Sequence, residues 1–160
     1  MAVTQGRRRA LIAILIAGVL GGSGCATLGP VYTKVDKVPE DRGLVYIYRP
    51  SGIMGSGVAY NVKVGDNVVT TLHSGGYFPY YSKPGEVEFW AKTESRSAVT
   101  IDVKPGQVYY LKGTLGVGFF VGRPHLLVVS ADVGEKEIAE CKLIPEPKKE
   151  DIKEENKTPK

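Results

Sequence analysis

The sequence contains few residues of the kinds that bind metals or support redox chemistry. Among its 160 residues there are two histidines, two cysteines and one tryptophan. A zinc site needs several cysteine, histidine or carboxylate ligands at a recognisable spacing, and no such spacing occurs. We therefore expect no metal and no cofactor.

Catalytic patterns are equally scarce. His73 lies beside Ser74 in a glycine-bearing turn, and His125 starts a β-favouring segment. A Ser-His-Asp site can assemble across a fold, so a hydrolase stays open as an alternative. However, no nucleophile elbow occurs, and the glycine clusters at 51–57 and 113–124 lack the lysine–serine ending of a phosphate loop. We expect a protein that is not an enzyme.

Acidic residues are absent from the first 24 positions, which hold Arg7, Arg8 and Arg9. The formal net charge of +4 comes from 21 basic and 17 acidic residues. Without these three arginines 18 basic residues face 17 acidic ones, which leaves +1. A nearly neutral domain lacks the positive field that a phosphate backbone requires, so we expect no nucleic-acid partner.

The chain also lacks a hydrophobic run long enough to cross a bilayer. The longest, at 10–20, would span roughly 16 Å as a helix, against about 30 Å of hydrocarbon. A basic start, this run and the small residues of 21–24 have the layout of a secretory signal peptide. An uncleaved helix that continues to Leu28 is the alternative.

The end of this leader, Gly22-Ser23-Gly24-Cys25, resembles a bacterial lipoprotein signal. In such signals a diacylglycerol is attached to the cysteine sulfur, the leader is cut before the cysteine, and the new amino group is acylated. The resemblance therefore implies lipidation at Cys25, and Ala26 after it implies the outer membrane. Gly22 departs from the pattern, where leucine is usual, and an ordinary cleavage site beside an unmodified cysteine is the alternative. With Cys25 acylated, Cys141 would be a lone thiol, which we expect to be buried.

The remaining chain predicts an all-β domain. Residues 26–42 lack periodicity and are expected to form a tether, with a short strand at 31–35. Short β-favouring segments follow, separated by turns, two of which have the sequence Lys-Pro-Gly. Pro79 interrupts one segment and places it at a sheet edge. The segments are at 44–48, 58–72 (a hairpin that turns at 65–67), 77–81, 86–92, 98–103, 108–115 and 125–130.

The fold predicted from these segments is an antiparallel β-sandwich of about seven short strands with one short C-terminal helix. Asp132 and Glu135 predict the helix start as a capping box, and Ile138 and Cys141 share its apolar face. The predicted organisation is a signal peptide at 1–24, a tether at 25–42, the sandwich at 43–143 and a disordered charged tail at 144–160.

Several segments together resemble the bacterial family called domain of unknown function 2846, which is commonly found on lipoproteins. They are "GLVYIYRPSG", the Gly65-Asp66-Asn67 hairpin, "SGGYFPYYSKPGEVEFWAK", "IDVKPGQVYYLKG" and "EKEIAECKL". The resemblance covers about residues 43–143 and implies a β-domain of the cell envelope. The family has no established activity, so it supplies no catalytic residue.

Aromatic residues provide the candidate binding surface. Four of them crowd into five positions, and the alternation of Val87, Phe89 and Ala91 predicts that Trp90 faces outward. Exposed aromatic rings stack on sugars or anchor protein partners, whereas the alternative is packing in the core. The five candidate residues are Tyr77, Phe78, Tyr80, Tyr81 and Trp90.

The apolar segment "VGFFV" at 117–121 admits two interpretations. We expect a strand that crosses into the core, and the alternative is an apolar loop that meets a membrane or a partner.

These observations predict a lipid-anchored protein of the bacterial envelope, held at the outer membrane and facing the periplasm. Its domain would act by binding another envelope protein or the cell wall. A glycan- or peptidoglycan-binding module that uses the aromatic residues is the alternative.

Overall fold

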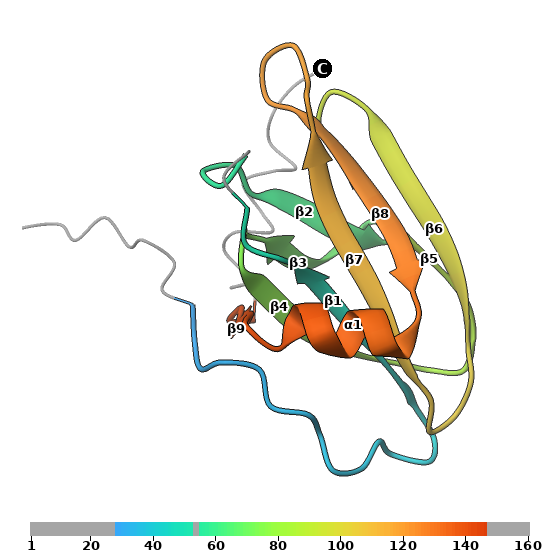
Figure 1. Ribbon diagram of the computed structural model, residues 1–160. Coiled ribbons are helices and arrows are strands. Elements are labelled where there is room, and N and C mark those ends of the chain that lie inside the picture. Colours follow the sequence, from blue (N-terminus) through green and yellow to red (C-terminus); the bar gives the residue numbers. More distant parts are fainter. Residues whose placement is uncertain (1–27, 53–54, 147–160) are drawn as a thin grey trace, which may run out of the picture.

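The computed structural model describes residues 28–52 and 55–146, which form two β-sheets packed face to face and one short helix (Figure 1). The first sheet has the order β8 (Arg123–Val129), β7 (Val108–Gly116), β1 (Gly43–Arg49), β4 (Gly76–Ser82) and β9 (Lys142–Leu143). The second has the order β3 (Asn67–Leu72), β2 (Tyr60–Val64), β5 (Gly85–Lys92) and β6 (Arg96–Val103). The predicted all-β sandwich is confirmed, with nine strands in the described ranges instead of about seven.

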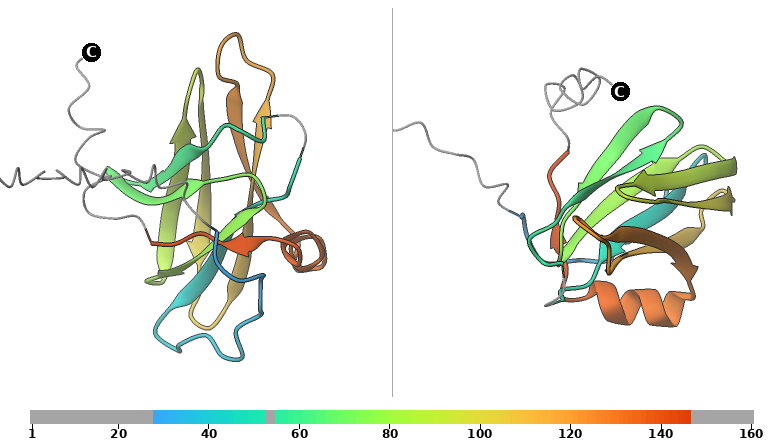
Figure 2. Two further views of the ribbon diagram at one scale, coloured as in Figure 1. Left: turned by 90° about the vertical axis from the view of Figure 1, so that its left-hand side faces the viewer. Right: turned by 90° about the horizontal axis from the view of Figure 1, so that it is seen from above.

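The helix α1 (Ala131–Ile138) covers the face of the first sheet that points away from the second (Figure 2). The centre of the first sheet is therefore buried on both faces. Every residue of its central strand β1 is buried, which explains the unbroken apolar run at 44–48. Val45 and Ile47 face the second sheet, while Tyr46 and Tyr48 lie in the smaller core beneath the helix.

Two strand pairs are parallel, which corrects the prediction of a purely antiparallel sandwich. β1 pairs with β7 and β4 pairs with β9 in parallel, and the other pairs of named strands are antiparallel. The physical reason is the path of the chain. After β4 the chain forms β5 and β6 in the second sheet and returns to the first beside β1, running in the same direction.

Local turn signals predicted most strand boundaries. Gly65, at φ 57°, turns the chain between β2 and β3, as the Gly-Asp-Asn sequence indicated. Pro79 lies opposite Tyr46 on β4, and on the other side of β4 the short β9 pairs only with Gly76 and Tyr77. Around Pro79, β4 therefore pairs on one side only, although β4 lies between β1 and β9 and is not the edge strand that was predicted.

Residues 28–42 pack along the domain, where we expected a tether. Gly29 N donates to the carbonyl of Leu143 at 2.7 Å, and Tyr32 N donates to that of Cys141 at 2.8 Å. The Tyr32 ring meets Tyr46 edge-on at 5.2 Å. The expected strand at 31–35 is reduced to one bridge between Val31 and Lys142.

The C-terminal boundary also moves outward, because Ile144 is buried against the main core. The predicted signal peptide, Cys25 and most of the predicted tail lie outside the described residues. Within those residues, no helix has the length and apolar character to cross a membrane.

The helix begins at Ala131 with Ser130 at its N-cap, and the predicted capping box does not form. The carboxylate of Glu135 instead accepts hydrogen bonds from Lys34 at 2.5 Å and from the hydroxyl of Tyr110 at 3.3 Å. These tertiary contacts compete with the local cap and fix the helix on the sheet.

The segment 117–121 forms no strand, so its predicted passage into the core is wrong. β7 ends at Gly116 and β8 begins at Arg123, and Phe119 and Phe120 between them are 85% and 87% exposed. Figure 1 shows this hairpin tip projecting beyond the ends of the other strands.

Candidate functional site

The four aromatic residues of β4 are divided between the two faces of the first sheet. Tyr77 is buried beneath the helix side, and Tyr81 on the same face is 39% exposed. Phe78 and Tyr80 face the second sheet, where the ring of Tyr80 meets Phe89 edge-on at 5.6 Å. Strand alternation separates the residues in this way, so clustering in sequence does not give a cluster in space.

Trp90 lies on the outer face of the other sheet, as its position between Phe89 and Ala91 predicted. Its indole nitrogen donates to the carbonyl of Gly65 at 2.8 Å. The Arg96 guanidinium lies 5.0 Å and the Lys63 ammonium 5.4 Å from the ring centroid. A hollow of about 470 Å³ beside the ring is also lined by Asp66 and Glu88. The five candidate aromatic residues therefore do not share one surface.

The candidate hydrolase residues do not form a Ser-His pair in the described part of the chain. The hydroxyl of Ser74 accepts a hydrogen bond from the backbone N–H of Gly52 at 3.3 Å. His73 is half-buried, and burial, with the nearby charge of Arg49, lowers its pKa. His125 is exposed on β8. The described residues also contain no group of three metal-ligating side chains.

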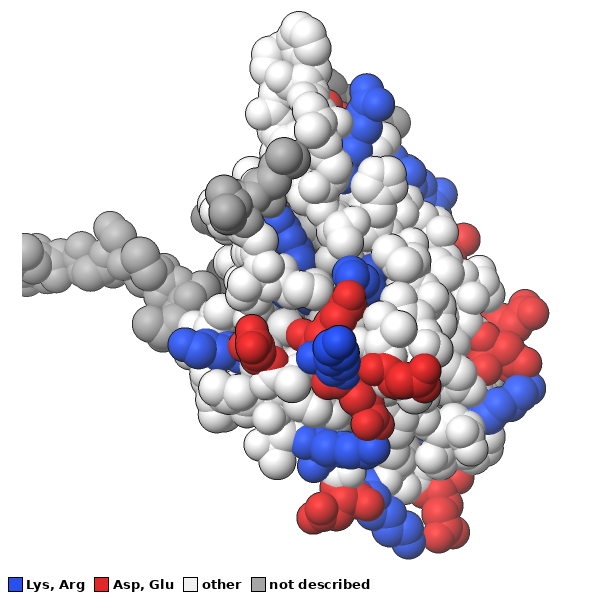
Figure 3. All heavy atoms as spheres, viewed as in Figure 1, with Lys and Arg blue, Asp and Glu red and all other residues white. Residues whose placement is uncertain are grey.

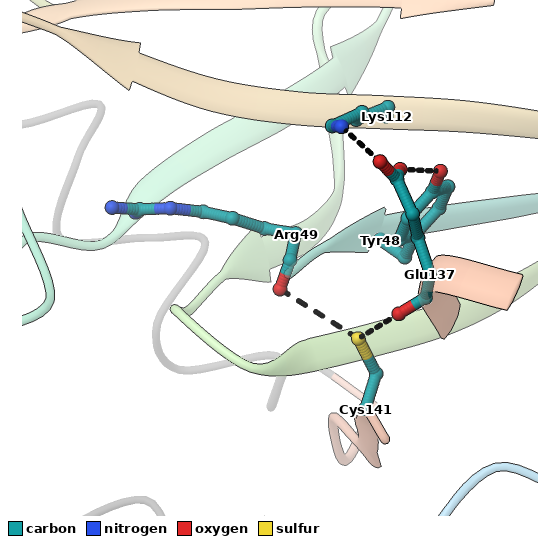
Figure 4. A network of polar contacts seen from close by, with 5 residues as sticks. All are labelled: Tyr48, Arg49, Lys112, Glu137 and Cys141. Atoms are coloured by element: carbon teal, nitrogen blue, oxygen red, sulfur yellow. Dashed lines mark hydrogen bonds and ion pairs between the residues drawn. The ribbon is translucent and has the colours of Figure 1, made fainter. Parts of the chain in front are cut away.

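A polar network joins the helix to the first sheet (Figure 4). The hydroxyl of Tyr48 donates to one carboxylate oxygen of Glu137 at 2.7 Å, and Lys112 binds the other at 2.5 Å. Burial alone would raise the pKa of Glu137, but the hydrogen bonds from Lys112 and Tyr48 outweigh it and lower that pKa. Burial and the bond to Glu137 raise the pKa of Tyr48. The group therefore holds a carboxylate, an ammonium and a neutral phenol at neutral pH.

Cys141 is buried at the edge of this network, as predicted for an unpaired cysteine. Its sulfur lies 3.7 Å from the carbonyl oxygens of Arg49 and Glu137. Burial raises the pKa of the thiol to about 11. A protonated, enclosed thiol is a weak nucleophile, so the position favours packing over reactivity.

Arg49 is the buried cation of the region, with 4% of its surface exposed. Figure 4 shows its side chain pointing away from Glu137. The guanidinium donates to the carbonyls of Gly55 and Val58, both at 2.7 Å, and lies 5.6 Å from the ring centroid of Tyr60. It thereby holds the chain that links β1 to β2.

A polar hollow of about 270 Å³ lies between this loop and the network. It is lined by Arg49, Ser51, Ser74, Lys112 and Glu137, among others. Its cations and hydroxyls suit a small polar ligand, but Lys112 is already neutralised by Glu137. The Lys112–Glu137 pair was not a candidate in the sequence, because its partners lie 25 positions apart and only tertiary packing brings them together.

Comparison with protein families places most of these residues in one known family. A family model described as "Protein of unknown function (DUF2846)" matches residues 39–122. The chain belongs to this family. Comparisons with curated proteins and with solved structures gave no match.

The match runs from before β1 to the end of the β7–β8 tip, so it includes Arg49, Trp90 and Lys112. Glu137 and Cys141 lie beyond it. Only the sheet half of the polar network therefore falls within the family match, and the helix half belongs to the C-terminal part of this chain.

Proposed function

We propose that this family member is a lipid-anchored protein of the bacterial envelope whose β-sandwich domain acts by binding.

 The observation that carries the proposal is the position of Cys25, directly after a basic, apolar and then small-residue leader. The family likeness and the β-sandwich fold are compatible with this role, but they do not bear on acylation. The proposed partners are the membrane, through Cys25, and a second component of the envelope.

The fold supports a close approach of the domain to the membrane. Leu28, the first residue that the structure describes, contacts the main core, and Gly29 is hydrogen-bonded to Leu143. Two residues lie between Cys25 and Leu28, so the three Cα–Cα steps from Cys25 to Leu28 span at most about 10 Å when extended. An acylated Cys25 would therefore hold the domain against the bilayer surface instead of on a long tether.

The proposed anchor is strong because it contains several acyl chains. Each buried CH₂ group contributes about 0.8 kcal/mol, so one chain binds only marginally, whereas two or more bind stably. The sulfur of an acylated Cys25 is a thioether, so Cys25 would form no disulfide with Cys141. Cys141 is buried, which agrees with a packing role for Cys141 and a lipid-bearing role for Cys25.

The test of the anchor is a Cys25→Ala substitution in cells that are fed labelled palmitate. We expect the wild-type chain to incorporate label and to fractionate with membranes, and the variant to lose both properties. Cys141→Ala is the matched control, because it removes the other cysteine and should keep the label. Membrane retention of the Cys25→Ala chain equal to that of the wild type would contradict the proposal and favour an uncleaved helix.

A second candidate function is the binding of a glycan or peptidoglycan at Trp90. The specific observation in its favour is the hollow beside Trp90, where an aromatic ring lies close to the cations of Lys63 and Arg96. Aromatic rings stack on sugars, and the polar side chains that line this hollow are of the kinds that hydrogen-bond sugar hydroxyls.

This candidate predicts that Trp90→Ala lowers retention of the protein on purified cell wall. Tyr81→Ala is the matched control, since it removes a part-exposed aromatic residue from the other sheet. Equal retention of the two variants and the wild type in a pull-down would exclude glycan binding at Trp90.

A further inference from the structure

The tip of the β7–β8 hairpin exposes apolar side chains to solvent. Among the residues that the structure describes, Phe119 and Phe120 are the most exposed large hydrophobic residues, and Val117 is 77% exposed. Their rings meet edge-on at 4.7 Å, so the two form one unit at the end of the hairpin. Figure 3 shows the tip as a white projection without charged atoms on its outer surface.

The tip is held in shape by a carboxylate from the neighbouring hairpin. Glu94, in the turn between β5 and β6, accepts hydrogen bonds from the backbone N–H groups of Phe119 at 2.7 Å and of Val121 at 2.6 Å, and also from that of Phe120. These bonds lower the pKa of Glu94 to about 2, the bond from Val121 contributing most. The carboxylate therefore stays ionised and bound at neutral pH.

Two further contacts close the tip. The hydroxyl of Thr93 donates to the carbonyl of Gly122 at 2.5 Å, which joins the two hairpins. A Cβ atom at Gly118 would lie 2.4 Å from Cα of Gly122, so only glycine permits this close approach. Because Glu94 satisfies three of its backbone N–H groups, the tip can leave water at a lower free-energy cost than an open loop.

The size and shape of the tip favour a lipid surface over a second protein. Its exposed side chains offer on the order of 500 Å² of apolar surface, below the roughly 800 Å² per partner of a stable protein interface. The tip is also convex. Shallow insertion into the boundary between lipid headgroups and acyl chains requires only a small apolar surface of this kind.

The charges around the tip match an anionic bilayer. Lys92 and Arg123 are exposed and adjoin Thr93 and Gly122, the two residues that join the hairpins. The nearby carboxylates are engaged: Glu94 is held by the tip amides, and Glu88 is paired with Arg96. In Figure 3, blue side chains lie just below the white tip.

We propose that the β7–β8 tip inserts Phe119 and Phe120 into the headgroup–acyl boundary of an anionic lipid bilayer. The inference builds on the proposed location of the domain at a membrane, but it does not require Cys25 to be acylated. The tip would give the domain a second membrane contact and so fix its orientation on the surface.

The experiment expresses the full sequence in cells and purifies the protein in whatever form the cells produce. The protein carries a single tryptophan, which is placed at the tip. Phe120→Trp is combined with Trp90→Phe, since Trp90 is the only native tryptophan. The chain is mixed with vesicles of phosphatidylethanolamine and phosphatidylglycerol that carry brominated acyl chains. We expect a blue shift of the emission and strong quenching by the brominated lipid, both weaker on vesicles of phosphatidylcholine.

The matched control is Val133→Trp combined with Trp90→Phe, because Val133 is also an exposed apolar residue but lies on the helix. Its tryptophan should be quenched far less. Circular dichroism verifies that both variants fold. Equal quenching at the two positions, or none at the tip, would overturn the proposal.

A blue shift at the tip without quenching by brominated lipid would also overturn it, because the tip would then be covered by a protein. Mass measurement of the same sample reports acylation of Cys25 separately. An acylated chain without quenching at the tip rejects insertion and leaves the proposed anchor intact. A chain that lacks acyl groups but is quenched at the tip retains the insertion and rejects the anchor.

Discussion

Replacing Gly134 with alanine is expected to destabilise the domain by about 2–3 kcal/mol, although alanine is the better helix former. A Cβ atom at this position would lie 2.2 Å from Cγ and 2.5 Å from Cβ of Tyr110. Tyr110 cannot yield easily, because its ring is buried and stacks on Tyr46 at 5.6 Å. The helix would have to move away from the sheet.

Helix propensity alone predicts the opposite sign, since alanine in place of glycine gains about 1 kcal/mol in a helix interior. The clash outweighs that gain because a contact of 2.2 Å to a buried ring forces the backbone to shift, which places the gross cost at about 3–4 kcal/mol, at or just above the upper end of the usual range for overpacking. Movement of the helix would also stretch the bonds of Glu137 to Tyr48 and Lys112.

Thermal unfolding and urea unfolding measure the effect, which corresponds to a fall in Tm of about 10 °C for a domain of this size. Val133→Ala is the matched control, because it changes a neighbouring, part-exposed helix residue and should alter stability by less than about 0.5 kcal/mol. A Gly134→Ala chain as stable as the wild type, or more so, would show that the helix does not depend on this close approach.

The helix that contains Gly134 shows what the sequence could and could not predict about the fold. Strand boundaries followed from local signals: β-branched and aromatic runs, alternation, and turns rich in glycine and proline. The capping box at Asp132 and Glu135 was predicted from equally local signals but did not form, because Lys34 and Tyr110 bind Glu135. Contacts between segments that lie far apart in the sequence therefore determined the conformation of the helix start.

The same distinction applies to the candidate sites. The outward position of Trp90 followed from strand alternation, whereas the division of Tyr77 and Phe78 between two faces was missed because the expected cluster ignored that same alternation. The exposure of Phe119 and Phe120 depends on Glu94, which lies 25 and 26 positions earlier in the chain. No periodicity in the sequence reports such a contact.

Replacing Arg49 with methionine is expected to destabilise the domain by about 2 kcal/mol and to loosen the chain between β1 and β2. The substitution keeps an unbranched side chain but removes the two hydrogen bonds to Gly55 and Val58. It also removes the cation that lies over the ring of Tyr60. Two carbonyl groups would lose their charged donor.

A smaller, stabilising effect opposes this loss, because replacing arginine with methionine removes the desolvation cost of a buried charge. We expect the loss to prevail, since the guanidinium already has two carbonyl partners and an aromatic ring in place of water. Arg49→Lys should restore little of the stability, because one ammonium group cannot reproduce the two-pronged geometry of a guanidinium.

Urea unfolding reports the global effect, and amide hydrogen exchange at Gly55 and Val58 reports the local one. Arg123→Met is the matched control, because Arg123 is exposed at the start of β8 and should be replaceable within about 0.5 kcal/mol. If Arg49→Met left both the unfolding midpoint and the exchange rates unchanged, other contacts would have to hold this loop. In that case the Lys112–Glu137 pair, which the substitution leaves intact, would have to maintain the shape of the polar hollow beside Arg49.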